Sequence, residues 1–118
     1  MDRKNTYGAQ VIREIEELIR SSCEEDHSLT SLGERFGFNP AYLGRLFKTV
    51  TGTGFSRYVT NVRIQKATSL LYETDMSVNA IRAHIGYSSN QHFNKMFKKH
   101  LGLTPAKYRQ YIREHQGE

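Results

Sequence analysis

An internal repeat limits what this chain of 118 residues can fold into. Five apolar or glycine positions recur at an offset of 49 residues. They pair Leu29 with Val78, Leu32 with Ile81, Phe36 with Ile85, Gly37 with Gly86 and Phe38 with Tyr87. The offset then becomes 50 and pairs Leu43 with Phe93, Arg45 with Lys95, Phe47 with Phe97, Lys48 with Lys98, Gly52 with Gly102 and Tyr58 with Tyr108. The second copy therefore has one extra residue in its turn. Because stacked repeats need about three units to bury a core, two copies favour a duplicated module over a solenoid.

Each copy has the signals of two short helices around a turn. In the first copy, Ser28 is a typical N-cap, and Gly37 ends the helix because glycine enters the left-handed conformation without strain. Asn39 then caps a second helix that has Pro40 at its first position, where the missing N–H is not needed. The second copy repeats the pattern with Ser77, Gly86 and a cap at Ser88 or Ser89. Both copies are thus predicted to be helix-turn-helix units.

Three further helices complete the predicted fold. Apolar periodicity predicts one from about Tyr7 to Glu24, a long one from Phe55 to about Glu73, and a closing one after Thr104-Pro105. The sequence Gly52-Thr53-Gly54 is interpreted as a turn, since no strand precedes it as a phosphate-binding loop requires. We expect an all-α fold of seven helices, with helix-turn-helix subdomains at residues 8–52 and 76–114 joined by a linker helix at 53–75.

Charge is distributed unevenly along the chain. The formal net charge is +5, and residues 60–118 hold nine Lys or Arg against four Asp or Glu, whereas residues 1–59 hold eight of each. This excess favours a polyanionic partner, nucleic acid before membrane. No apolar run approaches the roughly 18 residues of a membrane span and no signal-like segment follows Met1, so we expect no membrane contact and a cytoplasmic, nucleoid-associated location.

The second helix of each unit has a polar face opposite its buried stripe. At 100° per residue these faces match position for position, pairing Ala41 with Gln91, Gly44 with Asn94, Arg45 with Lys95 and Lys48 with Lys98. Amide, basic and small apolar side chains are those that read base edges in the DNA major groove. The base-contacting candidates are Ala41, Tyr42, Gly44, Arg45, Asn90, Gln91, His92, Asn94 and Lys95. The phosphate-contacting candidates are Lys48, Thr49, Ser88, Ser89, Lys98 and Lys99.

Other chemistries have little support in the sequence. His84, His92 and His100 fall on two helices without a third ligand at four-residue spacing, and Cys23 is the single cysteine, so no metal or other cofactor is predicted. No nucleophile stands with a base, which argues against an enzyme. A protein-interaction module that kept the helical frame is the remaining alternative, and Ala41 and Gly44 favour it because neither offers a polar reader.

The ordered residues of both copies resemble a known family, the DNA-binding domain of AraC/XylS-type transcription regulators. The resemblance covers about residues 8–113. It is carried by Leu29, Leu32, Phe36-Gly37-Phe38-Asn39-Pro40, Tyr42-Leu43, Arg45-Leu46-Phe47-Lys48, Gly52, Arg63, Ala67 and Leu70-Leu71 in the first part. In the second part it is carried by Ile81, Ile85-Gly86-Tyr87-Ser88, Phe93, Phe97-Lys98-Lys99, Gly102, Thr104-Pro105 and Tyr108-Arg109.

The resemblance implies two tandem, homeodomain-like helix-turn-helix subdomains whose second helices lie in the major groove of bacterial promoter DNA. It also implies an activator that works with RNA polymerase, and a separate N-terminal receiver or sensor domain. The residues in its reader positions would be Ala41, Tyr42, Gly44 and Arg45 in the first unit and Asn90, Gln91, Asn94 and Lys95 in the second. Because Ala41 and Gly44 offer no polar reader, we expect the second unit to carry most of the base reading and the first mainly to anchor.

Overall fold

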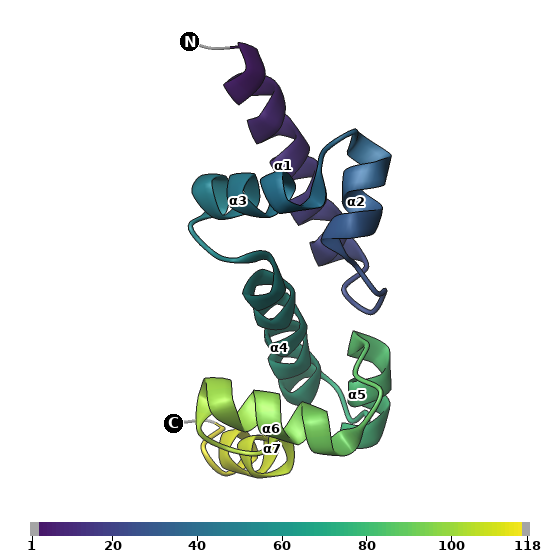
Figure 1. Ribbon diagram of the computed structural model, residues 1–118. Coiled ribbons are helices and arrows are strands. Elements are labelled where there is room, and N and C mark those ends of the chain that lie inside the picture. Colours follow the sequence, from purple (N-terminus) through teal and green to yellow (C-terminus); the bar gives the residue numbers. More distant parts are fainter. Residues whose placement is uncertain (1–2, 117–118) are drawn as a thin grey trace. The chain divides into compact units, whose positions relative to one another are not determined.

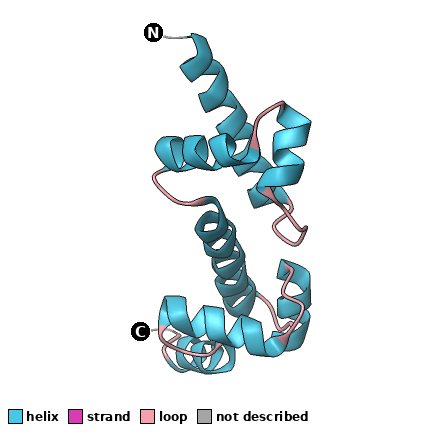
Figure 2. Cartoon of the chain, in the orientation of Figure 1, coloured by secondary structure: helices cyan, strands magenta, loops and turns pink. Residues whose placement is uncertain are grey.

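The computed structural model describes residues 3–116, and within this range it contains seven helices and no strand (Figures 1 and 2). The expected all-α fold is therefore confirmed. The helices are α1 (Arg3–Ser21), α2 (Leu29–Phe36), α3 (Pro40–Thr51), α4 (Phe55–Glu73), α5 (Val78–Ile85), α6 (Asn90–Leu101) and α7 (Pro105–Glu114). The chain divides into two compact units, and the division falls between Val62 and Arg63.

The first unit packs α1 and α2 against α3. Its buried core contains residues from α1 to the start of α4, and the innermost side chains of α3 are Leu43 and Phe47, both fully buried. The other core residues are Val11, Ile12, Ile15, Ile19, Leu32 and Phe55. The Tyr58 hydroxyl donates a hydrogen bond to the Glu16 carboxylate (3.0 Å) and accepts one from Arg20 (2.8 Å). Burial first, and then the bond to Glu16, raise the pKa of Tyr58.

The second unit repeats this plan, with α6 in contact with both α5 and α7. Phe93 and Phe97 are its fully buried side chains on α6 and correspond to Leu43 and Phe47 of the first unit. The rest of this core consists of Ile64, Ala67, Leu71, Ile81, Ile85 and Tyr87.

The long helix α4 serves two cores with different segments. Phe55 and its neighbours Tyr58, Val59 and Val62 pack in the first core, whereas Ile64, Ala67, Leu70 and Leu71 pack in the second. The apolar positions of α4 therefore form no single stripe along the helix. No helix in the described part of the chain is long and apolar enough to cross a membrane.

Helix α1 was expected from about Tyr7 to Glu24, but it begins at Arg3 and ends at Ser21. The hydroxyl of Ser22 donates to the carbonyl of Leu18 (2.7 Å), and Glu25 N–H bonds the Ser22 carbonyl (3.1 Å). Serine side chains that bond the backbone compete with helical hydrogen bonds, which explains why the helix stops before Glu24.

The two turns use different chemistry at one matched position. A Cβ atom on Gly33 would lie 2.5 Å from the Phe38 carbonyl oxygen, so the short first turn requires glycine there. The matching residue in the second unit is Arg82, whose guanidinium donates to the carbonyl of Tyr87. The second turn has one extra residue, and in it the Arg82 side chain bonds the Tyr87 carbonyl, which corresponds to the Phe38 carbonyl of the first turn.

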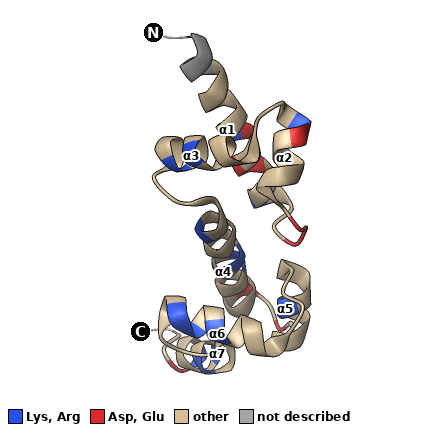
Figure 3. Cartoon of the chain, in the orientation of Figure 1, with Lys and Arg blue, Asp and Glu red and all other residues tan. Residues whose placement is uncertain are grey.

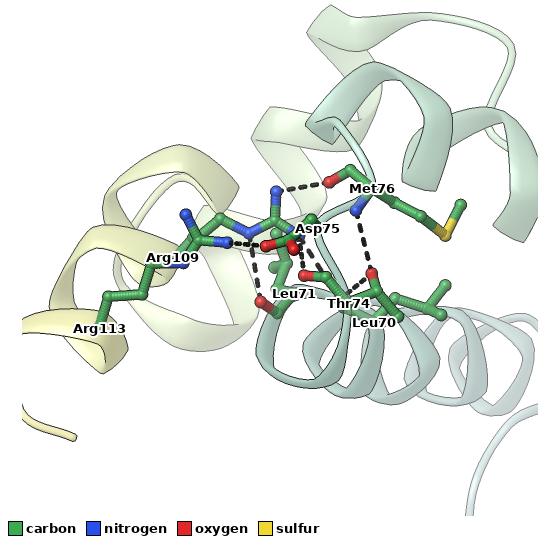
Figure 4. A network of polar contacts seen from close by, with 7 residues as sticks. All are labelled: Leu70, Leu71, Thr74, Asp75, Met76, Arg109 and Arg113. Carbon is green, nitrogen blue, oxygen red and sulfur yellow. Dashed lines mark hydrogen bonds and ion pairs between the residues drawn. The ribbon is translucent and has the colours of Figure 1, made fainter. Parts of the chain in front are cut away.

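Arg109 of α7 closes the end of α4 with its side chain (Figure 4). Helix C-termini leave carbonyl groups without helical partners, and a guanidinium with five donors can satisfy several at once. Its acceptors are the carbonyl oxygens of Leu71 (3.2 Å), Thr74 (3.2 Å), Leu70 (3.4 Å) and Met76. Burial lowers the pKa of Arg109, and neighbouring Arg113, which is paired with Asp75 at 2.9 Å, lowers it further.

Candidate nucleic-acid interface

The start of α3 is fixed by its turn. Gly37 adopts a left-handed conformation (φ 79°), and the Asn39 side chain accepts hydrogen bonds from the backbone N–H groups of Ala41 (2.9 Å) and Tyr42 (3.2 Å). Both predicted caps are confirmed, as is Pro40 at the first position of the helix. These contacts set which residues of α3 face away from the core.

The start of α6 is fixed in the same way. Gly86 is left-handed (φ 101°), and of the two candidate serines it is Ser89 whose hydroxyl caps the helix by accepting from His92 N–H (3.1 Å). Tyr87 is buried against Phe93, with ring centroids 5.6 Å apart, and the guanidinium carbon of Arg63 lies 5.4 Å from the Tyr87 ring centroid. Sequence reasoning missed this support by Arg63, because Arg63 lies on α4 and Tyr87 lies in the turn between α5 and α6.

The outward face of α3 carries the first set of predicted candidates. Exposed residues on this helix are Ala41, Tyr42, Arg45, Lys48 and Thr49. Tyr42 stacks on Phe38 with centroids 5.8 Å apart, and the Arg45 guanidinium carbon lies 6.0 Å from the Tyr42 ring centroid. The Thr49 hydroxyl already donates to the Arg45 carbonyl (2.9 Å), which leaves its oxygen as an acceptor only and makes it a weak candidate for phosphate.

Helix α6 exposes all of its predicted candidates. They are Asn90, Gln91, His92, Asn94, Lys95, Lys98 and Lys99, preceded by exposed Ser88 and Ser89. Phe93 and Phe97 occupy the opposite, buried side. The ring centroids of His92 and Tyr87 lie 5.2 Å apart in an edge-to-face arrangement, so this histidine packs against the turn.

Neither α3 nor α6 contains an acidic residue (Figure 3). In Figure 3 the acidic residues of the first unit are coloured on α1, on α2 and in the loop between them. The basic side chains on the outward faces are Arg45 and Lys48 on α3, and Lys95, Lys98 and Lys99 on α6. Both faces therefore attract polyanions without local repulsion.

Gly44 is the one candidate that is not exposed. A Cβ atom added to it would lie 3.0 Å from a terminal methyl carbon of Leu29 on α2. Around Gly44 the surface forms an open hollow, whose lining includes Leu29, Pro40, Ala41, Arg45 and Lys48. Sequence reasoning missed Leu29 and Pro40 as part of this surface, because an apolar helix residue and a helix-start proline are expected to be structural.

A second hollow follows the end of α3. Its lining includes Lys48, Gly54, Arg57 and Asn61. Arg57 was also missed in the sequence, although it matches Lys107 at the repeat offset of 50. Among the residues described by the structure, no group of three His, Cys, Asp or Glu side chains could hold a metal ion.

Comparison with known proteins agrees with this geometry. A family model described as a helix-turn-helix domain matches residues 32–111. The transcriptional regulator YtdP of Bacillus subtilis is 40% identical over 96 residues, which are 81% of this chain and 12% of that protein. The chain thus spans about an eighth of the length of this relative.

Solved structures show the same fold. The C-terminal domain of AraT, a response regulator from Geobacillus stearothermophilus, matches with a TM-score of 0.81 and 30% identity, over 86% of this chain and 84% of that one. The DNA-binding domain of AdpA, solved in complex with a target DNA, matches with a TM-score of 0.79 and 24% identity, over 94% and 96%. This likeness concerns the fold alone.

These matches define a class of tandem helix-turn-helix domains that serve transcription regulators. Within that class, the chain belongs to the AraC-type family of DNA-binding domains. The resemblance seen in the sequence is therefore confirmed. The family is one of transcription regulators and not of enzymes.

Proposed function

We propose that this chain binds double-stranded promoter DNA in a sequence-specific manner, as the output domain of a bacterial transcription regulator. The observation that carries the proposal is the pair of matched outward faces on α3 and α6, which are polar or basic, free of acids, and built on the same helix-turn-helix frame. In such units the second helix enters the major groove.

On both faces, we assign some residues to base contacts and others to phosphate contacts. Gln91, Asn94 and Lys95 carry amide and ammonium groups that suit adenine and guanine edges. Lys48 and Lys98 lie one turn further along their helices and suit phosphates, which fix orientation without reading sequence. Asn90, His92, Tyr42 and Arg45 complete the proposed base-contacting set, and Ser88, Ser89 and Lys99 the phosphate-contacting set.

In the proposed binding mode, the two units that α4 joins bind one duplex. Its 19 residues span roughly 28 Å at 1.5 Å per residue. Units about one turn of B-DNA apart, roughly 34 Å, can enter successive major grooves. We accordingly assign residues 8–52 and 76–114 to the two binding subdomains and residues 53–75 to the linker helix.

The wider setting follows from the relatives. AraT is a response regulator and contributes its C-terminal domain to the comparison. By analogy, this chain would follow an N-terminal receiver or sensor domain, act in the cytoplasm at the nucleoid, and activate transcription by positioning RNA polymerase. It would need no metal, cofactor or catalytic step.

Titration with duplex DNA at several salt concentrations tests the binding itself. Each lysine that neutralises a phosphate contributes about −0.9 to the slope of log affinity against log salt. We expect tight binding at low salt and a steep loss as salt rises. Selection of sites from random DNA should then return a defined motif.

Failure to bind any duplex at low salt would overturn the proposal and favour a protein-interaction module. The observation that supports this alternative is an aromatic stack in the first unit. It consists of Tyr7 (55% exposed), Phe38 and Tyr42 (45% exposed), with successive centroids 6.0 and 5.8 Å apart.

A further inference from the structure

We propose that the hollow at Gly44 receives the 5-methyl group of a thymine, so that the first unit reads a T·A base pair by shape. This inference rests on the proposed function, because it places a base of the bound duplex against α3. It assigns a reading role to a position that has no side chain.

The floor of the hollow is apolar. Gly44 brings the backbone of α3 close to α2, and a methyl carbon of Leu29 lies 3.0 Å from the point where a Cβ atom would be. Pro40 and Ala41 extend the same lining. These apolar groups can bury a methyl group, but they offer no side-chain hydrogen-bond donor or acceptor to a base edge.

The hollow lies in the middle of the predicted reading face. Gly44 is three residues after Ala41 and four before Lys48, so all three share one side of α3. Arg45 leans toward the Tyr42 ring at 6.0 Å. A base edge that approaches between Ala41 and Lys48 therefore meets Gly44 and Leu29 first.

The chemistry of the lining indicates which base the hollow can bind. Among the four bases, only thymine presents a methyl group in the major groove. The basic residues Arg45 and Lys48 also line the hollow, and α3 has no acid, so a polyanion that carries such a group is the matching partner. The second unit has polar Asn94 at the equivalent position, where an amide favours adenine instead.

The test uses the highest-affinity duplex obtained by selection from random DNA. Each thymine is replaced singly by deoxyuridine, which removes only the methyl group, and affinity is measured by fluorescence anisotropy. Burial of one methyl group predicts a loss of roughly fourfold at one thymine in the part of the site bound by the first unit.

Gly44→Asn places in the hollow the residue that the second unit has. In this variant, deoxyuridine at that thymine should bind as well as thymine does. Asn94→Gly is the matched control. In this variant, replacing that thymine by deoxyuridine should still lower the affinity by roughly fourfold. Thermal melting checks that the variant folds, and Gly44→Ser, with a smaller side chain, replaces it if Gly44→Asn does not fold.

The outcomes separate the two proposals. Salt-sensitive binding in which no thymine depends on its methyl group overturns the thymine-reading role and leaves the DNA-binding proposal standing. A methyl effect of equal size in wild type and Gly44→Asn also overturns the role of Gly44. Loss of all duplex binding in the wild type overturns the DNA-binding proposal itself.

Discussion

At the scale of single residues, matching positions on α3 and α6 carry different chemistry. Position 91 is a glutamine where the first unit has Ala41, and position 94 is an asparagine where it has Gly44. A third matched position is a lysine in both copies, Lys48 in the first and Lys98 in the second. Among these three pairs, the residues differ at the two positions proposed to contact bases and agree at the position proposed to contact a phosphate.

Gln91→Ala and Lys98→Ala should consequently fail in different ways. Gln91→Ala is expected to relax preference at one base position at a cost of about 1–3 kcal/mol, because a base-edge partner is lost. Lys98→Ala should weaken all sequences alike and reduce the salt slope by about 1. Site selection and salt titration of both variants distinguish the effects, and an unchanged motif with Gln91→Ala would remove that residue from the base-contacting set.

Local signals allowed the sequence to predict the helix ends. Asn39, Gly37 and Thr104 act within four residues of themselves, so their roles are visible in the sequence. The role of Arg109 was not visible, since its carbonyl partners lie 33 to 39 residues away. The Gly44 hollow was missed for a similar reason, because it depends on the contact of Gly44 with Leu29 on another helix.

At the scale of elements, each turn depends on one residue in the helix before it. The Gly33 carbonyl accepts hydrogen bonds from the N–H groups of Gly37 and Phe38, both at 2.8 Å, and the Phe38 carbonyl oxygen lies only 2.5 Å from where a Cβ atom of residue 33 would be. This close approach holds α2 against the start of α3. No comparable constraint applies to Gly54, around which a Cβ atom would meet nothing within 4 Å.

Gly33→Ala should therefore destabilise the first unit by roughly 2 kcal/mol, because the added methyl group overlaps a backbone oxygen. Gly54→Ala is the control and should change the free energy of unfolding by less than about 0.5 kcal/mol. Urea denaturation followed by circular dichroism measures both. Equal stability of the two variants would show that the turn relaxes at no cost.

At the scale of the whole molecule, two separate cores share one continuous helix. The apolar residues of α4 up to Val62 belong to one core, and those from Ile64 onward belong to the other. Sequence periodicity predicted α4 as one long helix from Phe55 to about Glu73. It could not divide the helix between the cores, because the division depends on which residues of the two units pack against each face.

Arg109→Lys should lower the stability of the second unit selectively. One ammonium group cannot reach carbonyls that are spread over the end of α4 and the loop after it, so a loss of about 1.5–3 kcal/mol is expected. Arg113→Lys is the control, since water screens its pair with the fully exposed Asp75 and the pair contributes little to stability. Amide hydrogen exchange in α2 and α5 reports each unit separately, and equal losses in both helices would contradict independent cores.

The contrast between Gly33 and Arg82 limits how the two copies can be recombined. Transplanting the four-residue segment Gly86–Ser89 into the first copy, without position 82, would leave the Tyr87 carbonyl without the guanidinium that it has now. The reverse transplant would press a carbonyl oxygen against the side chain of Arg82. The smallest exchangeable part of such a duplicated domain is therefore the first helix together with its turn, and chimeric regulators should be joined before α2 or α5.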